Sequence, residues 1–392
     1  MYFDACINSK IRFYNPINFI IQPNFFRRGN IIMKKYIKKL AIFQVLAAIG
    51  IASLSAQTPD APRQTAADRL NDTLFECRVP GFAQSNYDRA VSVLFSAFER
   101  ESGEKIAPAS KGRVGLKIYT NSGVGMCTPR ALVDAVVSQL EKRGYKRENI
   151  TLVDMSRRKM RDCGFLPRVS ALQNGTPDNY KGSPVADIES GKFFDKNWYY
   201  DNSLMPKSMK NINMSSDLYN PELRKSYLPV PLFLTVDFWI NLPVITDMEG
   251  LGVCAAIGNA SIWNMSNNER FLKQPANASM AAAEVSAIPE LHSSNLLTIL
   301  SYERGQFVGG AIFNSRCSFS ENTILMSSNP VVIDYLAWNT INKYRRSFGF
   351  APIDPMPPLL NYCKELKIGD YDMRKIRRVN VPYAPAKTKS GK

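Results

Sequence analysis

The 392-residue chain has a single histidine, His292, and none of its seven cysteines forms a Cys-x-x-Cys pair. The missing pairs argue against an iron–sulfur cluster, a structural zinc site and a thioredoxin-type redox motif. The commonest general base is also nearly absent, and we interpret His292, beside an expected turn, as a surface residue. Acid–base chemistry in this chain would therefore depend on Asp or Lys.

No apolar run reaches the roughly 20 residues that a membrane-spanning helix needs. The run nearest to that length, Leu40 to Leu54, has 15 residues. Lysines precede it and small residues follow it, which is the order of a secretory signal peptide. We expect a signal peptide over 33–56, an over-extended start over 1–32, a periplasmic or secreted mature protein and no stable membrane span.

The formal net charge of +16 becomes smaller when the expected leader is removed. Residues 1–56 hold 8 of the 50 basic and 1 of the 34 acidic residues, so the remainder carries +9. Several basic residues after Met373 form a polar end that we interpret as a solvated tail. The rest lacks a basic stripe interleaved with aromatic residues, so no nucleic-acid partner is expected.

Six cysteines remain after residue 56: Cys77, Cys127, Cys163, Cys254, Cys317 and Cys363. An oxidising compartment permits disulfides among them. Six cysteines allow 15 pairings, and the sequence does not choose among them.

A β-α-β unit is the clearest piece of architecture. Residues 114–119 have the composition of a buried strand, and a Gly-rich turn follows them. Thr128 is a good helix N-cap, with Pro129 at the first helical position, and apolar residues recur at helical spacing until Gly144. Residues 150–154 return as a strand, and the short crossover predicts two parallel strands.

The fold class predicted is α/β, a mostly parallel central sheet flanked by helices, with a long ordered insertion. We expect a lead-in over 57–110, an α/β domain over 111–349 with the polar insertion at 166–229, and a Pro-rich basic tail over 350–392. The insertion could be a lid, and its aromatic residues around Trp198 should pack on the body. Further strands are expected within 231–244 and at 296–301, 309–313 and 323–326, before a helix that Asn329-Pro330 opens.

The turn after the first strand offers candidate ligand-binding residues at Asn121, Gly123 and Gly125. Exposed amides at a helix N-terminus attract phosphate or carboxylate. The third glycine of a dinucleotide fingerprint is missing, although Asp154 stands close to the expected acidic position. A plain tight turn is therefore the favoured interpretation.

A second group of candidates follows the apolar run. Asp237, Asn241, Asp247 and Asn259 are expected around a strand end, where ligands usually bind in α/β proteins. Oxygen ligands of this kind suit a hard divalent cation or a small-molecule ligand, whereas the alternative is that they cap turns. Asp334 lies one turn into the helix that Asn329-Pro330 opens. It could approach a ligand above the sheet, or its negative charge could simply be favoured near the N-terminus of a helix.

Three blocks of sequence resemble the bacterial and archaeal family called domain of unknown function 362. The first runs from Gly115-Leu116-Lys117-Ile118 through Pro129 and Gly144 to Asp154, and resembles the opening strand, loop and helix of that family. The block Val236-Asp237-Phe238-Trp239-Ile240-Asn241-Leu242-Pro243 resembles its "acid, then Ile-Asn-Leu-Pro" strand, and 327–334 resembles its "Asp-Pro-Val-Ala-x-Asp" helix start.

The resemblance covers about 111–349 and implies an α/β fold. After the Leu-Pro element the family usually has a Lys-x-x-His and then a Lys-Asn pair, whereas this chain has 244–247 and Gly258-Asn259, so only the Asn is kept. Any chemistry of those Lys and His residues is lost or replaced here. The ferredoxin-like cysteine motifs of some relatives are also missing.

We therefore expect an exported protein with a ligand site at the carboxyl ends of the central strands. A binding module explains the missing Lys and His most simply. The alternative is a hydrolase or lyase-like enzyme for a small anionic or carbohydrate-like substrate, with Lys117, Asp237, Asp247 and Asp334 as catalytic candidates. A redox carrier has no support from the cysteine spacing, and no cofactor or particular metal is indicated.

Overall fold

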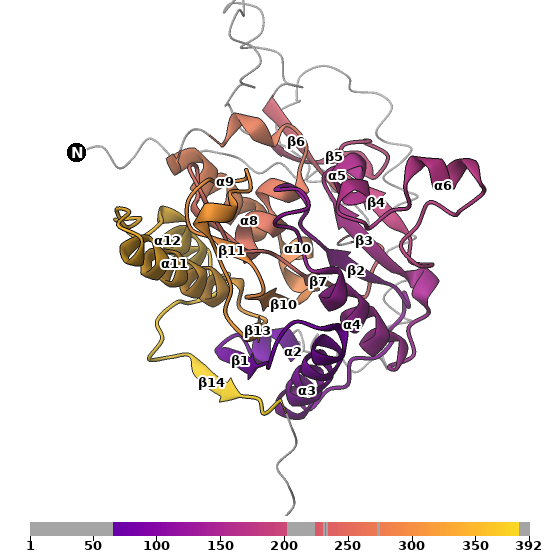
Figure 1. Ribbon diagram of the computed structural model, residues 1–392, viewed down its shortest axis with the longest axis horizontal. Helices are drawn as coiled ribbons and strands as arrows, with labels where there is room; N and C mark the ends of the chain where they lie inside the picture. Colours follow the sequence, from indigo (N-terminus) through magenta and orange to yellow (C-terminus); the bar gives the residue numbers. More distant parts are fainter. Residues whose placement is uncertain (1–65, 202–223, 230–231, 233, 273–274, 384–392) are drawn as a thin grey trace, which may run out of the picture. The chain divides into compact units, whose positions relative to one another are not determined.

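A β-sheet forms the centre of the protein in the computed structural model, which describes residues 66–201, 224–229, 232, 234–272 and 275–383 (Figure 1). The expected over-extended start (1–32) and signal peptide (33–56) lie outside the described residues. In the described part the sheet has eight strands, in the order β14-β1-β13-β10-β7-β2-β3-β4. Their bounds are β1 Thr73–Arg78, β2 Val114–Lys117, β3 Ile150–Asp154, β4 Val185–Asp187, β7 Phe238–Asn241, β10 Asn295–Ser301, β13 Thr323–Ser327 and β14 Arg377–Asn380.

The sheet is mostly parallel. Strand β13 runs antiparallel to both of its neighbours, β1 and β10, and every other pairing of neighbours is parallel. The carboxyl ends of β10, β7, β2, β3 and β4 consequently share one edge of the sheet, here called the carboxyl edge. The predicted α/β fold with a mostly parallel sheet is confirmed.

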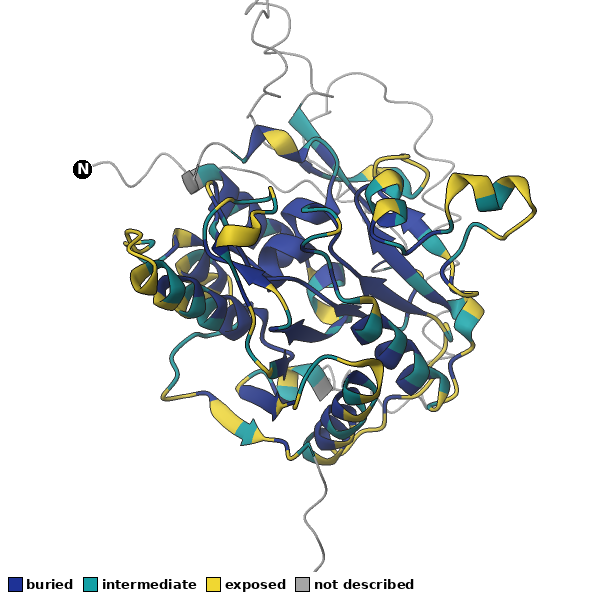
Figure 2. Ribbon diagram, in the orientation of Figure 1, coloured by how far each residue is buried: buried dark blue, intermediate teal, exposed yellow. Residues whose placement is uncertain are grey.

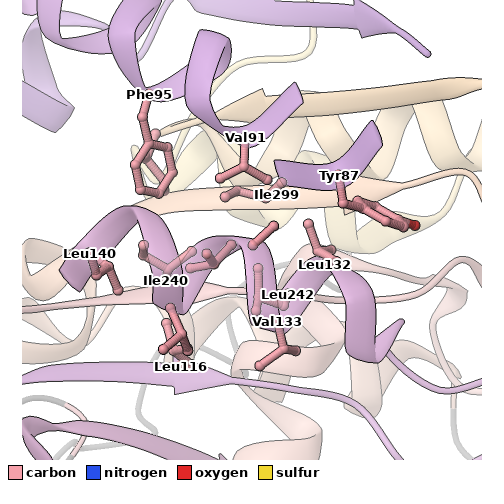
Figure 3. Packing of buried hydrophobic residues seen from close by; sticks show 14 of the residues in the cluster. Tyr87, Val91, Phe95, Leu116, Leu132, Val133, Leu140, Ile240, Leu242 and Ile299 are labelled. Carbon is pink, nitrogen blue, oxygen red and sulfur yellow. The ribbon is translucent and has the colours of Figure 1, made fainter. Parts of the chain in front are cut away.

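Helices cover both faces of the sheet. On one face, α3 (Gln84–Ser102) and α4 (Arg130–Glu141) pack on side chains such as Leu116 and Ile240 (Figure 3). Figure 2 shows the central strands of the sheet buried between the helices, whose outer faces carry exposed residues, whereas β14 at the margin of the sheet is mostly exposed. The other face is covered by α8 Ala256–Ala260, α9 Pro275–Ser286, α10 Pro289–Ser294, α11 Pro330–Ser347 and α12 Pro358–Glu365.

Short elements complete the described chain. The two-stranded pairs are β5 Phe194–Asp201 with β6 Lys225–Pro229, β8 Thr246–Met248 with β9 Gly252–Cys254, and β11 Gly305–Gln306 with β12 Ser318–Phe319. The short helices are α2 Ala66–Arg69, α5 Arg157–Asp162, α6 Val169–Gln173 and the single 3₁₀ turns η1 Arg147–Asn149, η4 Ile262–Asn264, η5 Asn268–Arg270 and η6 Ser315–Cys317.

The β2-α4-β3 unit agrees with the sequence pattern except at its cap. β2 and β3 pair in parallel, and the apolar residues of α4 that recur at helical spacing are buried. The hydroxyl of Thr128 does not cap the helix. It accepts a hydrogen bond from the Tyr119 amide (2.8 Å) and donates to the Leu242 carbonyl (2.6 Å). Thr128 therefore ties the loop after β2 to the end of β7.

The polar insertion at 166–229 contributes to the sheet itself. Strand β4 extends the central sheet beyond β3, and the β5-β6 pair follows it. As expected, Trp198 and its neighbours Phe193 and Phe194 pack on the body of the protein, against the hydrophobic cluster on the α8 face. Residues 202–223 of the insertion lie outside the described residues.

Segments expected to lie outside the α/β domain at 111–349 also belong to the sheet. The lead-in supplies β1 and α3, and the basic tail supplies α12 and β14, which pairs with β1. The tail is held because Arg377 and Arg378 form ion pairs with Glu101 (2.8 Å) and Glu76 (2.7 Å). The strand expected at 309–313 is a turn instead, since Gly309 and Gly310 have φ values of 131° and 62°.

Candidate functional site

Three neighbouring parallel strands end in polar residues at the carboxyl edge. Asn241 ends β7, Lys117 ends β2 and Asp154 ends β3, in the spatial order of those strands. All three residues are fully buried, at 0% exposure. Together with Thr120 and Asn259 they form a hydrogen-bonded set, here called the buried polar cluster.

Lys117 lies at the middle of this cluster. Its ammonium group donates to Asp154 Oδ1 (2.7 Å), Asn259 Oδ1 (3.0 Å) and the carbonyl of Ile118 (2.8 Å). An ammonium group has three N–H donors, so these bonds use all of them. Burial lowers the pKa of Lys117, while the carboxylate of Asp154 acts in the opposite direction.

Asp154 connects the ion pair to the loop after β2. Its Oδ2 accepts hydrogen bonds from both the amide and the hydroxyl of Thr120, each at 2.6 Å. Both carboxylate oxygens are thus bonded, as a buried charge requires. The Lys117–Asp154 pair therefore fixes the start of the loop that leads to α4.

Asn259 brings α8 onto the strand ends. Its Nδ2 donates to Asn241 Oδ1 (2.8 Å), and Asn241 Nδ2 donates to the carbonyl of Ala256 (2.7 Å) at the first residue of α8. Gly258 is required beside Asn259, since an added Cβ would lie 2.6 Å from Cys254 Sγ. Helix α8 therefore covers the cluster on the face of the sheet opposite α3 and α4.

Asp334 on α11 holds the N-terminus of α8. The amides of Ala256 and Ile257 donate to its two oxygens at 2.5 and 3.2 Å, and the residue is fully buried. Burial raises the pKa of Asp334 to about 8, against the lowering effect of the two amide hydrogen bonds. The neighbouring Cys254 thiol has its pKa raised to about 12, first by burial and then by the charge of Asp334. Asp334 reaches the cluster through α8 rather than by a direct hydrogen bond.

The loop between β2 and α4 covers the cluster as a series of tight turns. Gly123 N donates to Thr120 O (2.9 Å), and Met126 N donates to Gly123 O (3.1 Å). Gly123 has a φ of 76°, which favours glycine. The Phe313 ring leaves no space beside Gly125, where an added Cβ would lie 1.9 Å from a ring carbon.

Two basic side chains bond to this loop, one near its start and one near its end. Lys159 Nζ donates to the carbonyl of Asn121 (3.0 Å), and Arg304 Nη1 donates to the carbonyl of Gly125 (2.6 Å). The side-chain Nδ2 of Asn121 is buried and has no hydrogen-bond partner among the described residues. The loop thus has one buried amide group without a partner among the described residues, and two cationic side chains from other segments bond to its carbonyl groups.

Two of the candidate carboxylates lie elsewhere. Asp237 precedes β7, at the opposite edge of the sheet, and accepts hydrogen bonds from the amides of Ala109 (2.9 Å) and Lys111 (2.8 Å). Asp247 lies in β8, where its carboxylate accepts from Gly310 N (2.9 Å) and lies 3.6 Å from Arg345 Nη1. The expected gathering of Asp237, Asn241, Asp247 and Asn259 is thus reduced to the Asn241–Asn259 pair.

His292, interpreted above as a surface residue, is partly buried in α10, and burial lowers its pKa. In the described part of the chain, no three His, Cys, Asp or Glu side chains come together as metal ligands would. No helix in that part combines the length and apolar composition needed to cross a bilayer.

Sequence reasoning missed Asp154 and Thr120 as members of the cluster. The sequence does contain a signal for Asp154. Lys117 and Asp154 are the last residues of two strands predicted to be parallel, and parallel strands joined by one helix often lie side by side. Two opposite charges at such strand ends indicate an ion pair.

A comparison with protein-family models gives no match for this chain, and comparisons with curated proteins and with solved structures give none either. The functional argument therefore depends on the geometry of the carboxyl edge and on the sequence resemblance described above.

Proposed function

We propose that the protein is an exported α/β protein of the domain of unknown function 362 type that binds a small anionic ligand at the carboxyl edge of its sheet. One observation carries the proposal. The end residues of three neighbouring parallel strands, Asn241, Lys117 and Asp154, meet in one fully buried network directly beneath a polar loop. This edge of an α/β sheet is the usual position of ligand sites.

The energetics of the cluster support a role in holding the loop. A buried ion pair is often no more stabilising than apolar residues of similar volume, so the Lys117–Asp154 pair is not explained by stability alone. It does bond both the amide and the hydroxyl of Thr120. A site that is fixed before its ligand arrives loses less entropy on binding.

The charges beside the loop indicate the class of ligand. Lys159 and Arg304 each donate to a loop carbonyl and bring positive charge to the two ends of residues 121–125. Positive groups and exposed amides are the usual partners of a carboxylate or phosphate. A cation is the less suitable ligand at this loop.

Thermal unfolding of the mature protein tests the proposal with inorganic phosphate, a small dicarboxylate, a neutral sugar and a divalent cation, each added separately. A bound ligand stabilises the folded state by mass action, so an anion should raise Tm. The Lys159→Ala/Arg304→Ala double variant should lose that rise. Arg158→Ala, on the same helix as Lys159 but with a side chain 90% exposed, is the matched control and should keep it. Stabilisation by the sugar or cation alone, or an unchanged response of the double variant, contradicts the proposal.

A hydrolase or lyase acting on the same class of molecule is the second candidate. The lowered pKa of Lys117, caused by burial, favours it, because a lysine nearer its neutral form is a better general base. All three N–H donors of Lys117 are engaged, however, so catalysis would require α8 to move. Mass spectrometry of a bound anion after incubation decides this question: chemical change supports an enzyme, and recovery of the unchanged anion supports a binding protein.

A further inference from the structure

A hollow of about 280 Å³ lies between α11 and the strands β1, β13 and β14, and is here called the α11 hollow. It is distinct from the loop at 121–125. In the sheet order β1 is four strands away from β2, which is roughly 19 Å at the usual spacing of neighbouring strands. The residues of the hollow that can bond a ligand include Glu76, Arg78, Tyr302, Glu321, Thr340 and Arg378.

The side chains of β1 change from apolar to charged along the face that lines the hollow. Alternate residues of a strand share a face, so Leu74, Glu76 and Arg78 point to the same side of the sheet. Leu74 is buried in the hydrophobic cluster on the α11 face. Helix α11 packs on β13 and β10, whereas β1 and β14 continue the sheet beyond them. The carboxyl end of β1 therefore lines a polar space instead of an apolar core.

Glu76 holds two arginines at the floor of the hollow. Its side chain is 10% exposed, Arg378 Nη2 lies 2.7 Å from Oε2, and Arg78 Nε lies 3.6 Å from Oε1. The side chains of Arg378 and Arg78 are 53% and 85% exposed. A guanidinium group has five N–H donors, so one contact with Glu76 leaves others for a ligand. Two cations beside one carboxylate also leave positive charge on the floor.

Tyr302 and Glu321 bring hydrogen-bond acceptors to the same hollow. The Tyr302 hydroxyl lies 3.5 Å from Thr340 Oγ1, which itself donates its only proton to the carbonyl of Leu336 (2.9 Å). The Tyr302 proton is therefore directed to Thr340, and its lone pairs can accept. Burial raises the pKa of Tyr302, so the group stays a neutral hydroxyl. Glu321 Oε1 accepts from Lys343 Nζ (2.8 Å), and a carboxylate can accept further bonds.

We propose that the α11 hollow binds a monosaccharide that carries an anionic group, either a carboxylate or a phosphate. The anionic group pairs with Arg78 and Arg378, since charge-assisted hydrogen bonds from guanidinium groups are among the strongest in proteins. The hydroxyl groups of the sugar donate to Tyr302 and Glu321. A volume of about 280 Å³ is at the small end of ligand sites, which suits one sugar ring. This site does not depend on the ligand proposed for the loop at 121–125.

Isothermal titration calorimetry of the mature protein with glucuronate, glucose 6-phosphate and glucose tests the proposal. At least one of the two charged sugars should bind, and the one that binds more tightly identifies the anionic group. Glucose should bind at least about tenfold more weakly, because it lacks the charge that the arginines recognise. Arg78→Ala should weaken binding of the charged sugar about tenfold, and Tyr302→Phe about fivefold. Arg346→Ala, at an exposed position of α11 outside the hollow, is the control and should bind as the parent does.

The Lys159→Ala/Arg304→Ala double variant separates this site from the loop at 121–125. It should bind the charged sugar as the parent does, whatever becomes of the anion response at the loop. Three outcomes overturn the proposal. They are an absence of binding by both charged sugars, binding of glucose as tight as theirs, and binding that is lost in the double variant but unchanged in Arg78→Ala.

Discussion

Lys117 and Asp154, the last residues of the neighbouring parallel strands β2 and β3, form an ion pair in which both side chains are fully buried and Nζ lies 2.7 Å from Oδ1. Asp154 also holds Thr120, so the pair connects the sheet to the loop above it. Removing one partner leaves a buried charge without compensation. The pair is therefore a point at which the stability of the fold and the shape of the candidate site can be tested together.

Lys117→Met should lower the free energy of unfolding by about 3–5 kcal/mol, because Asp154 would remain buried and unpaired. Urea denaturation measures the effect. The double variant Lys117→Met/Asp154→Asn should recover a large part of the loss, since an amide in place of the carboxylate carries no charge and still offers an oxygen to Thr120. Lys146→Met, at an exposed position, is the control. Equal losses in the single and double variants would contradict this account.

Gly125→Ala should lower the free energy of unfolding by about 1–3 kcal/mol, the usual cost of inserting a methyl group into occupied space. The added Cβ would lie 1.9 Å from a carbon of the Phe313 ring, so the ring or the loop must shift. Gly125→Ala/Phe313→Leu should regain stability because a smaller side chain leaves room. Gly81→Ala is a matched control with its nearest atom at 3.7 Å. A Gly125→Ala variant as stable as the control would show that Phe313 moves freely.

The parts of the fold that depend on local pattern could be predicted from the sequence. The apolar spacing of α4 and the Asn329-Pro330 start of α11 both correspond to the observed helices, and Asn329 Oδ1 accepts from Val331 N (2.9 Å) and Val332 N (3.2 Å). These signals lie within a few residues of each other. Local chemistry therefore decides them.

The parts that depend on distant partners could not be predicted. β14 is polar and short, and it becomes a strand because β1 offers an edge and Glu76 pairs with Arg378 from 302 positions along the chain. Asp237 has the composition of a site residue, yet it lies at the amino end of β7, where it holds the amides of Ala109 and Lys111. A sequence can predict that a strand forms. It does not predict at which end of the strand a polar side chain will lie or which groups it will bond.

Export should remove the chain before about Gln57, because the charged, apolar and small-residue regions occur in the order that signal peptidase recognises. N-terminal sequencing of the protein recovered from the periplasm or medium checks the position. Replacing Ser55 and Ala56 with bulky residues should slow processing, whereas a change at Thr58 should not. A protein that still begins at Met1 or Met33 would contradict both the expected location and the expected start.

Asp334 should make the protein lose stability as the pH rises from about 4 to about 8. Burial raises its pKa from 3.8 to about 8, so between these values the folded state binds a proton that the unfolded state lacks. The contribution of this group is complete below the unfolded pKa and falls by up to about 1.4 kcal/mol per pH unit toward the folded pKa. Asp334→Asn cannot titrate, so the parent's advantage over this variant in urea denaturation should shrink with rising pH. Asp162→Asn, at an exposed position of α5, should keep the parent's slope. An advantage that grows with pH would instead show that the two amides of α8 hold Asp334 as a carboxylate with a lowered pKa.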